Sequence, residues 1–304
     1  MNNPSNAVPE SPFESQEIAP VAISATRRLY WSMRRELWES RYIYIAPLAG
    51  AALILFAFLI RLVHLPDGIR AASKMSQMQR QELIQQPYTF GALLIMAAAF
   101  IVGVFYSLEA LHGERRDRSI LFWKSLPVSD LMTVLSKASI PLLVLPLLSF
   151  AITVVTQWGM LLLSAAVLLA NGVSVALLWR ELSLFHMWLM LLYHLLAIHA
   201  LWYAPIYGWL LLVSAWARRG AFLWATLPLL AIHVVEKTAF NTSHFAVMLQ
   251  HRLIGQPQGV PFIGGSMTMD PLFLPIDSGL WIGLAVAAVC LVMAVRLRRH
   301  RSPI

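Results

Sequence analysis

The chain has 304 residues, of which 59% are hydrophobic and only 12% are charged. Soluble domains average roughly 45–50% apolar and about 25% charged residues, so the mean hydropathy of +0.67 is unusually high. This composition excludes a disordered chain, a disulfide scaffold and an ordinary soluble enzyme, and it predicts a polytopic membrane protein. The chain has one cysteine, Cys290, which excludes an intrachain disulfide or a cysteine metal cluster.

The amino-terminal stretch 1–23 is polar and proline-containing and carries three glutamates, the reverse of a secretory signal peptide. We predict a disordered cytoplasmic tail here. Residues 24–42 mix arginine with aromatic side chains, which predicts a helix lying in the lipid headgroup layer. The residues expected to contact headgroups are Arg27, Trp31, Arg34, Arg35 and Trp38. The alternative is a cytoplasmic helix that extends the first span.

Six apolar stretches follow, and a hydrocarbon core of about 30 Å needs about 20 helical residues at about 1.5 Å each. The predicted spans are 43–63, 88–110, 138–170, 185–215, 221–240 and 279–296. They indicate an all-α polytopic membrane protein in which 24–304 form a single transmembrane domain.

The nearly uncharged stretch 140–178 is ambiguous, because it can form one tilted span or two tightly turned ones. If it crosses once and the amino terminus is inside, 16 of the 23 lysines and arginines face the cytoplasm. Cytoplasmic loops are enriched in these residues, so we predict six spans with both termini cytoplasmic. The same distribution explains the net charge of +8 without a nucleic-acid partner.

The segment 241–278 separates the last two predicted spans and is rich in glycine, proline and apolar side chains. Non-helical backbone at membrane depth must be shielded by protein or face water. We therefore expect this outer segment to pack on or dip into the outer edge of the membrane.

Four histidines, His186, His194, His199 and His233, lie in or near predicted spans. Ionisable residues in a membrane are candidates for function, but a neutral imidazole also forms simple interhelical hydrogen bonds. The chain has no Walker A, H-E-x-x-H or G-x-S-x-G motif, so we expect no ATPase activity and no metal site in it. Two alternatives stay open: an ion-coupled secondary carrier, and an intramembrane enzyme that uses His233 and Glu236.

The loop 111–137 concentrates charge and aromatic residues. A cluster of mixed charge is followed by the apolar residues 120–123, a break at Leu126-Pro127, and a helix start that Ser129 or Asp130 can cap. Its aromatic side chains need cover from a partner protein or from the bilayer interface, and the residues alone do not decide between these.

The string E-R-R-D-R-S-I-L-F-W-K-S-L-P-V-S-D at 114–130 resembles the loop after the second span in permeases of the bacterial ABC-2 family. The segment R-E-L-W-E at 35–39 is similar to the helix that precedes the first span in that family. The resemblance implies the membrane subunit of an ATP-driven exporter in the bacterial inner membrane. It further implies a second permease copy or a related permease, and separate ATP-binding subunits that hold ATP and Mg. The resemblance implies no cofactor for this chain itself. It implies that membrane lipids surround the chain, and it does not identify the transported cargo.

The resemblance also implies that the loop contains a coupling helix, which docks in a groove of the ATP-binding subunit. The buried anchors would be Phe122, Trp123 and Leu126. The remaining contact residues would be Glu114, Arg115, Arg116, Asp117, Arg118, Ser119, Lys124 and Pro127, with the charged side chains forming a polar rim.

Overall fold

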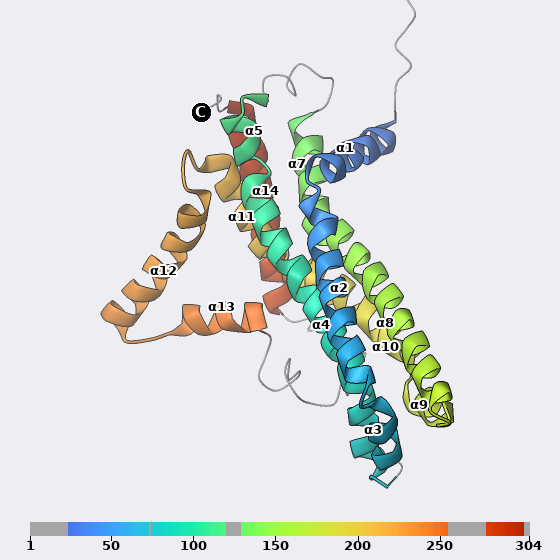
Figure 1. The fold of residues 1–304 in the computed structure, drawn as a ribbon. Coiled ribbons are helices and arrows are strands. Elements are labelled where there is room, and N and C mark those ends of the chain that lie inside the picture. The colour runs from blue at the N-terminus through green and yellow to red at the C-terminus, as the bar shows by residue number, and fades with distance from the viewer. Residues whose placement is uncertain (1–23, 73, 120–128, 255–277, 301–304) are drawn as a thin grey trace, which may run out of the picture.

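The computed structural model describes residues 24–72, 74–119, 129–254 and 278–300, and every regular element in these ranges is a helix (Figure 1). Within them, six helical stretches are long and apolar enough to cross a membrane. These are Tyr42–Leu62, Gln77–Arg116, Asp130–Ala170, Ala176–Trp202, Ala221–Phe240 and Ser278–His300. The chain therefore has the all-α, multi-pass architecture that its composition predicts.

The first helix is separate from the first candidate span. α1 (Ala25–Glu39) begins after Ser24, whose hydroxyl accepts a hydrogen bond from the backbone N–H of Arg27 at 3.4 Å. It ends at Ser40, and α2 (Tyr42–Leu62) then runs in a different direction, with α1 lying across its end (Figure 1). A short helix, α3 (Leu65–Ala72), follows at the far end of α2.

Residues 140–170 of the ambiguous apolar stretch form part of one continuous helix, and 176–178 belong to the next helix. α4 (Gln77–Glu109) and α5 (His112–Arg116) lead to the 120–128 stretch, after which α7 (Asp130–Ser139), the π-helical η1 (Ile140–Val144) and α8 (Leu145–Ala170) follow without a break. The hydroxyl of Ser129 caps α7, accepting from Met132 N–H at 3.2 Å, as predicted. Pro141 and Pro146 lack the N–H that a regular helix needs, and the wider π turn lies where they interrupt the ladder.

The predicted span 185–215 is divided in the structure. α9 (Ala176–Glu181), α10 (Leu184–His194) and π-helical η2 (Leu195–Trp202) form one candidate span, and α11 (Ala204–Trp216) is a shorter apolar helix after it. Tyr203 lies in the turn between them, and Pro205 occupies the first turn of α11, where its missing N–H is tolerated.

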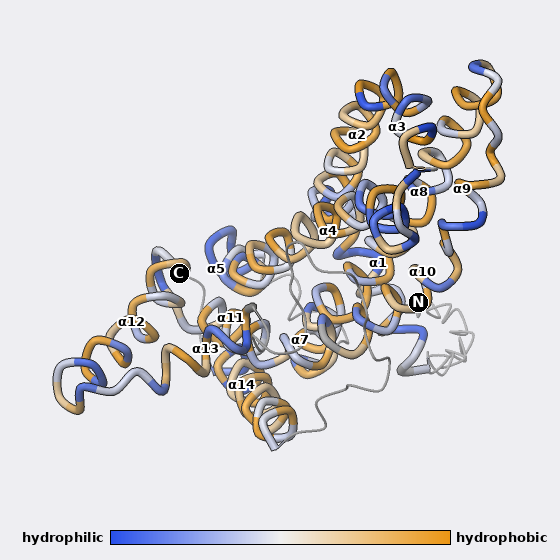
Figure 2. Tube along the Cα trace, turned by 90° about the horizontal axis from the view of Figure 1, so that it is seen from below, coloured by the Kyte–Doolittle hydropathy of each residue, from blue (hydrophilic) through white to orange (hydrophobic). Residues whose placement is uncertain are grey.

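Two of the last three helices extend away from the bundle, and the third packs against it. α12 (Ala221–Phe240) and α13 (His244–Ile254), the α12–α13 arm, extend to one side of the other helices (Figures 1 and 2). α14 (Ser278–His300) packs along α11. Gly208 permits this close crossing, because a Cβ there would lie 3.2 Å from the backbone of Ala287.

The main apolar core lies between α2, α4 and α8, around Tyr88, Ile95, Met160 and Leu161. Many large apolar side chains of the long helices are exposed, and Figure 2 shows that most of these helices are rich in hydrophobic residues. We call the end with α1, α5, α7 and the last turns of α14 the α5 end, and the opposite end, with α3 and α9, the α3 end (Figure 1).

Candidate functional site

Charged side chains from four helices meet at the α5 end. We call them the ion-pair cluster: Glu36 of α1, Glu114 of α5, Asp130 and Lys137 of α7, and Arg298 of α14. All except Asp130 are buried, with at most 6% of each residue exposed. Acidic and basic side chains are almost never this buried unless they are paired.

Lys137 is shared by two carboxylates. Its Nζ lies 3.0 Å from Glu36 Oε2 and 3.1 Å from Glu114 Oε1. Arg298 is shared in the same way, with Nη1 donating to Glu114 Oε2 and Nε donating to Asp130 Oδ1 at 3.0 Å. The ion pairs therefore join α1, α5, α7 and α14 in one continuous chain.

Two further groups complete the surroundings of Glu36. The hydroxyl of Tyr106, from α4, donates to Glu36 Oε2 at 2.8 Å. Arg35 Nη2 donates to Glu36 Oε1 at 2.6 Å and lies 3.7 Å from Glu114 Oε1. α4 is thereby attached to the same cluster.

Together with Arg35, the ion-pair cluster has equal numbers of positive and negative charges. Glu36, Glu114 and Asp130 provide three negative charges, and Arg35, Lys137 and Arg298 provide three positive ones. Burial by itself would raise the pKa of Glu36, but the cations of Lys137 and Arg35 outweigh it and lower that pKa below its ordinary value of 4.5. Glu36 is therefore ionised at neutral pH, as its two basic partners require.

α5 is also fixed to the end of α11. The hydroxyl of Ser214 accepts hydrogen bonds from the backbone N–H groups of Leu111 and His112 at 3.0 and 2.9 Å. The guanidinium of Arg115 donates to the carbonyl oxygen of Ala215 at 2.8 Å. These contacts orient α5 so that Glu114 points into the cluster.

The predicted coupling residues differ in their burial. Glu114 and Arg115, predicted as part of an exposed polar rim, are buried by contacts within the chain. Arg116, Asp117 and Arg118 are exposed. Ser119 is half-buried, with its hydroxyl 3.4 Å from the carbonyl oxygen of Glu114. The predicted docking residues Phe122, Trp123, Lys124, Leu126 and Pro127 lie outside the described residues.

The two flanks of the 120–128 stretch meet in the ion-pair cluster. Glu114 belongs to the helix that precedes it, and Asp130 and Lys137 belong to the helix that follows. α5 ends as the backbone of Arg118 turns into the left-handed region with φ of 58°, which side-chain-bearing residues seldom adopt. A displacement of either flank therefore acts on the same buried ion pairs.

The predicted headgroup-contacting residues of α1 lie on two sides of that helix. Arg27, Trp31, Arg34 and Trp38 are exposed, and the guanidinium of Arg34 lies 5.1 Å and 5.3 Å from the ring centroids of Trp31 and Trp38. Arg35 instead points toward Glu36. The outward side of α1 thus combines cations and aromatic rings.

Sequence reasoning missed the central role of Glu36, Lys137 and Arg298. It used Lys137 and Arg298 only to count positive charges by side, and Glu36 only as part of the R-E-L-W-E segment. The available signal was a charged residue beside an apolar stretch, since such a residue needs a partner of opposite charge when it is buried. Asp130 was predicted only as a possible helix cap, and its carboxylate pairs with Arg298.

His199 and Glu236 have structural contacts within the chain. His199 is buried, and its Nε2 lies 3.1 Å from the hydroxyl of Tyr207. The carboxylate of Glu236 accepts from the hydroxyl of Thr242 at 3.0 Å and from the backbone N–H of His244 and Phe245 at 2.6 and 2.9 Å. Glu236 therefore caps the start of α13. In the described ranges, no three His, Cys, Asp or Glu side chains gather as ligands for a metal ion.

Comparison with family models, curated proteins and solved structures finds no match to this chain. In the part of the chain that the structure describes, the fold is all-α, and six helices are long and apolar enough to cross a membrane.

Proposed function

We propose that this chain is the membrane-spanning subunit of an ATP-driven ABC exporter in the bacterial inner membrane, with both termini cytoplasmic. It would couple to a separate ATP-binding subunit through the loop 114–130. The observation that supports this most is the ion-pair cluster, because it attaches the two flanks of that loop, α5 and α7, to each other and to α1 and α14.

In this proposal the cluster transmits force. A movement of the docked loop displaces Glu114 and Asp130, which are paired with Lys137 and Arg298. Separating buried ion pairs leaves charges uncompensated, so α7 and α14 move with the loop rather than away from it. Because α7 continues into α8, the displacement is delivered along the length of the bundle as a rigid-body movement.

The proposal assigns ATP and Mg to the partner subunit and the translocation path to two permease copies. The alternatives have less support. In the alternative of an intramembrane enzyme, Glu236 is a catalytic residue, but its carboxylate caps α13. In the alternative of ion coupling, His199 is a candidate, but it is hydrogen-bonded to Tyr207 and surrounded by aromatic side chains.

The test is copurification of the full-length tagged chain from its native membranes in mild detergent, followed by measurement of ATP hydrolysis. We expect an ATP-binding subunit to copurify with the wild-type chain and to be lost with Phe122→Asp and with Trp123→Ala. The matched control is Trp38→Ala, because Trp38 is an exposed aromatic residue on α1 at the same end of the molecule. An intact wild-type chain that copurifies with no ATP-binding subunit would contradict the proposal.

A further inference from the structure

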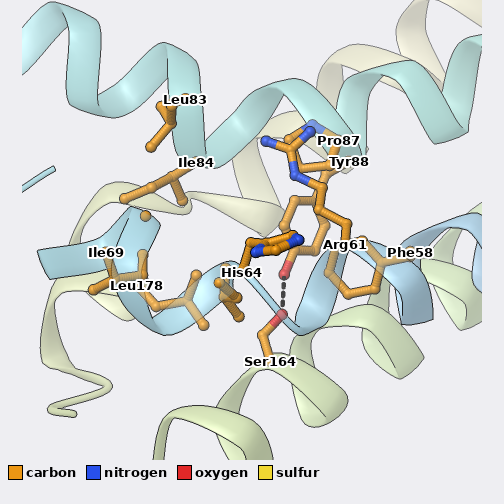
Figure 3. A pocket seen from close by; sticks show the side chains of 12 residues that line it. Phe58, Arg61, His64, Ile69, Leu83, Ile84, Pro87, Tyr88, Ser164 and Leu178 are labelled. Carbon is orange, nitrogen blue, oxygen red and sulfur yellow. Dashed lines mark hydrogen bonds between the residues drawn. The ribbon is translucent and has the colours of Figure 1, made fainter. Parts of the chain in front are cut away.

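A cavity of about 190 Å³ lies at the α3 end, where α2, α3, α4 and α8 come together (Figure 3). Most of its lining is apolar, with Phe58, Ile69, Ile84 and Leu178 among the side chains. Its volume is below the roughly 300–1,000 Å³ of sites for drug-sized ligands. It therefore fits a narrow apolar group.

The two buried polar side chains in the cavity wall, Tyr88 and Ser164, already have partners. The hydroxyl of Tyr88 lies 3.4 Å from that of Ser164 (Figure 3), and Ser164 also donates to the carbonyl oxygen of Met160 at 2.8 Å. Both residues are at most 1% exposed. The interior thus offers apolar surface and no charged partner to a ligand.

Two basic side chains border this apolar space. Arg61 and His64, three positions apart in the chain, both line the cavity and are both exposed (Figure 3). Neither has an ion pair or a side-chain hydrogen bond to any residue that the structure describes, and the nearby carboxylate of Asp67 pairs with Arg70 at 3.1 Å. A guanidinium and an imidazole N–H are therefore available to an anion at this site.

The basic pair lies at the depth of lipid phosphates if α2 crosses a membrane. α2 has 21 apolar-rich residues, which at about 1.5 Å per residue match a hydrocarbon core of about 30 Å. Arg61 lies in the last turn of α2, and His64 follows that helix. The cations are thus at one edge of the apolar layer, where the cavity begins.

We infer that this cavity binds an anionic phospholipid, with its phosphate at Arg61 and His64 and part of one acyl chain against the apolar wall. Charge complementarity selects an anion at the border. The apolar lining selects a lipid over free phosphate, because free phosphate leaves that surface unfilled. The inference does not depend on the proposed transport function, since it concerns the α3 end and not the coupling loop.

Native mass spectrometry of the full chain, purified and delipidated in mild detergent, tests this inference. The probe is added phosphatidylglycerol, compared with phosphatidylcholine and with inorganic phosphate. We expect the wild-type chain to retain phosphatidylglycerol preferentially and Arg61→Gln to lower its apparent affinity about tenfold, the usual range for losing a charge-assisted hydrogen bond. Lys74→Gln, just after α3 and outside the cavity lining, should leave binding unchanged.

A second variant blocks the cavity without changing charge. Gly68 lines the cavity, and a Cβ added there meets no atom within 4 Å. Gly68→Leu should therefore fold, since leucine is the better helix former, and should also lower lipid retention. Unchanged retention in both Arg61→Gln and Gly68→Leu would overturn the inference. So would equal binding of the two lipids, or displacement of phosphatidylglycerol by millimolar inorganic phosphate.

Discussion

The α5 end and the α12–α13 arm are held in opposite ways. At the α5 end, buried ion pairs link helices that are up to 184 positions apart in the chain. In α12 only Ala221 and Ala225, in its first turns, are buried, and most of its remaining side chains are exposed. The first region is suited to pass a displacement between helices, and the second has few contacts that oppose independent movement.

The arm is attached mainly at its two ends. Near its start, the rings of Trp216 and Trp224 pack edge to face at 4.7 Å between centroids. Near its end, the guanidinium of Arg252 lies 4.2 Å from the ring centroid of Trp202 and donates to the carbonyl oxygen of Gly279 at 3.2 Å. The comparison therefore predicts that a substitution at the α5 end destabilises several helices together by a large amount. A substitution that affects the arm should have a smaller effect that stays within the arm.

The largest effect is expected from Arg298→Met. This change leaves the carboxylates of Glu114 and Asp130 without their shared cation, and removing one member of a buried ion pair costs about 3–5 kcal/mol. Arg296→Met is the matched control, because Arg296 is exposed on the same helix, and surface substitutions usually change stability by less than about 0.5 kcal/mol. The free energy of unfolding in bicelles measures both. Equal free energies of unfolding for Arg298→Met and Arg296→Met would contradict the predicted difference between a buried and an exposed charge.

Acidification should destabilise the α5 end by a smaller amount, since it neutralises Glu36 while its hydrogen-bonding neighbours stay in place. The pKa of Glu36 is lower in the folded chain than its ordinary value of 4.5, so its ionisation stabilises the fold above about pH 4.5. That contribution is lost as the pH falls through the folded-state pKa. We expect the Tm to fall below pH 4.5, and to fall less steeply in Glu36→Gln. An identical acid dependence in wild type and Glu36→Gln would show that Glu36 does not contribute.

The smallest and most local effect is expected in the arm, from Gly283→Ala. A Cβ at Gly283 would coincide with the guanidinium of Arg252, so that side chain must leave its position over Trp202. A lost cation–π contact and hydrogen bond amount to about 1–2 kcal/mol. Hydrogen exchange of 244–254 should become faster while the α5 end stays protected.

Gly279→Ala is the control for that substitution, because a Cβ at Gly279 meets no atom within 4 Å. We expect exchange in 244–254 to match the wild type. If exchange in 244–254 also matches the wild type in Gly283→Ala, Arg252 does not hold the arm in place.

The apolar helices were predictable from the sequence because hydropathy is a local property. The single helix through 140–170 and the cap at Ser129 follow from charge distribution and helix-start chemistry that neighbouring residues carry. The interruption at Tyr203 was missed, although Pro205 was a local signal for it.

The ion-pair cluster was not predictable in the same way. Glu36 and Lys137 are 101 positions apart, and no local pattern specifies which buried cation meets which carboxylate. The charged string at 114–118 was interpreted as an exposed surface, yet Glu114 and Arg115 point inward because α5 is tied to Ser214 and Ala215 at the end of α11. Tertiary contacts, rather than the string itself, decide which of these charges face a partner.

A double-mutant cycle between Glu114→Gln and Lys137→Met tests the central claim most directly, because it isolates the ion pair that joins the two flanks of the loop. The free energy of unfolding of the wild type, both single variants and the double variant is measured in the same bicelles at neutral pH. The buried ion-pair cluster predicts an interaction free energy of about 1.5 kcal/mol or more, within the range of about 0.5–3 kcal/mol for residues in contact. Effects that add to within about 0.5 kcal/mol would show that the Glu114–Lys137 ion pair does not couple the two flanks and would contradict the account.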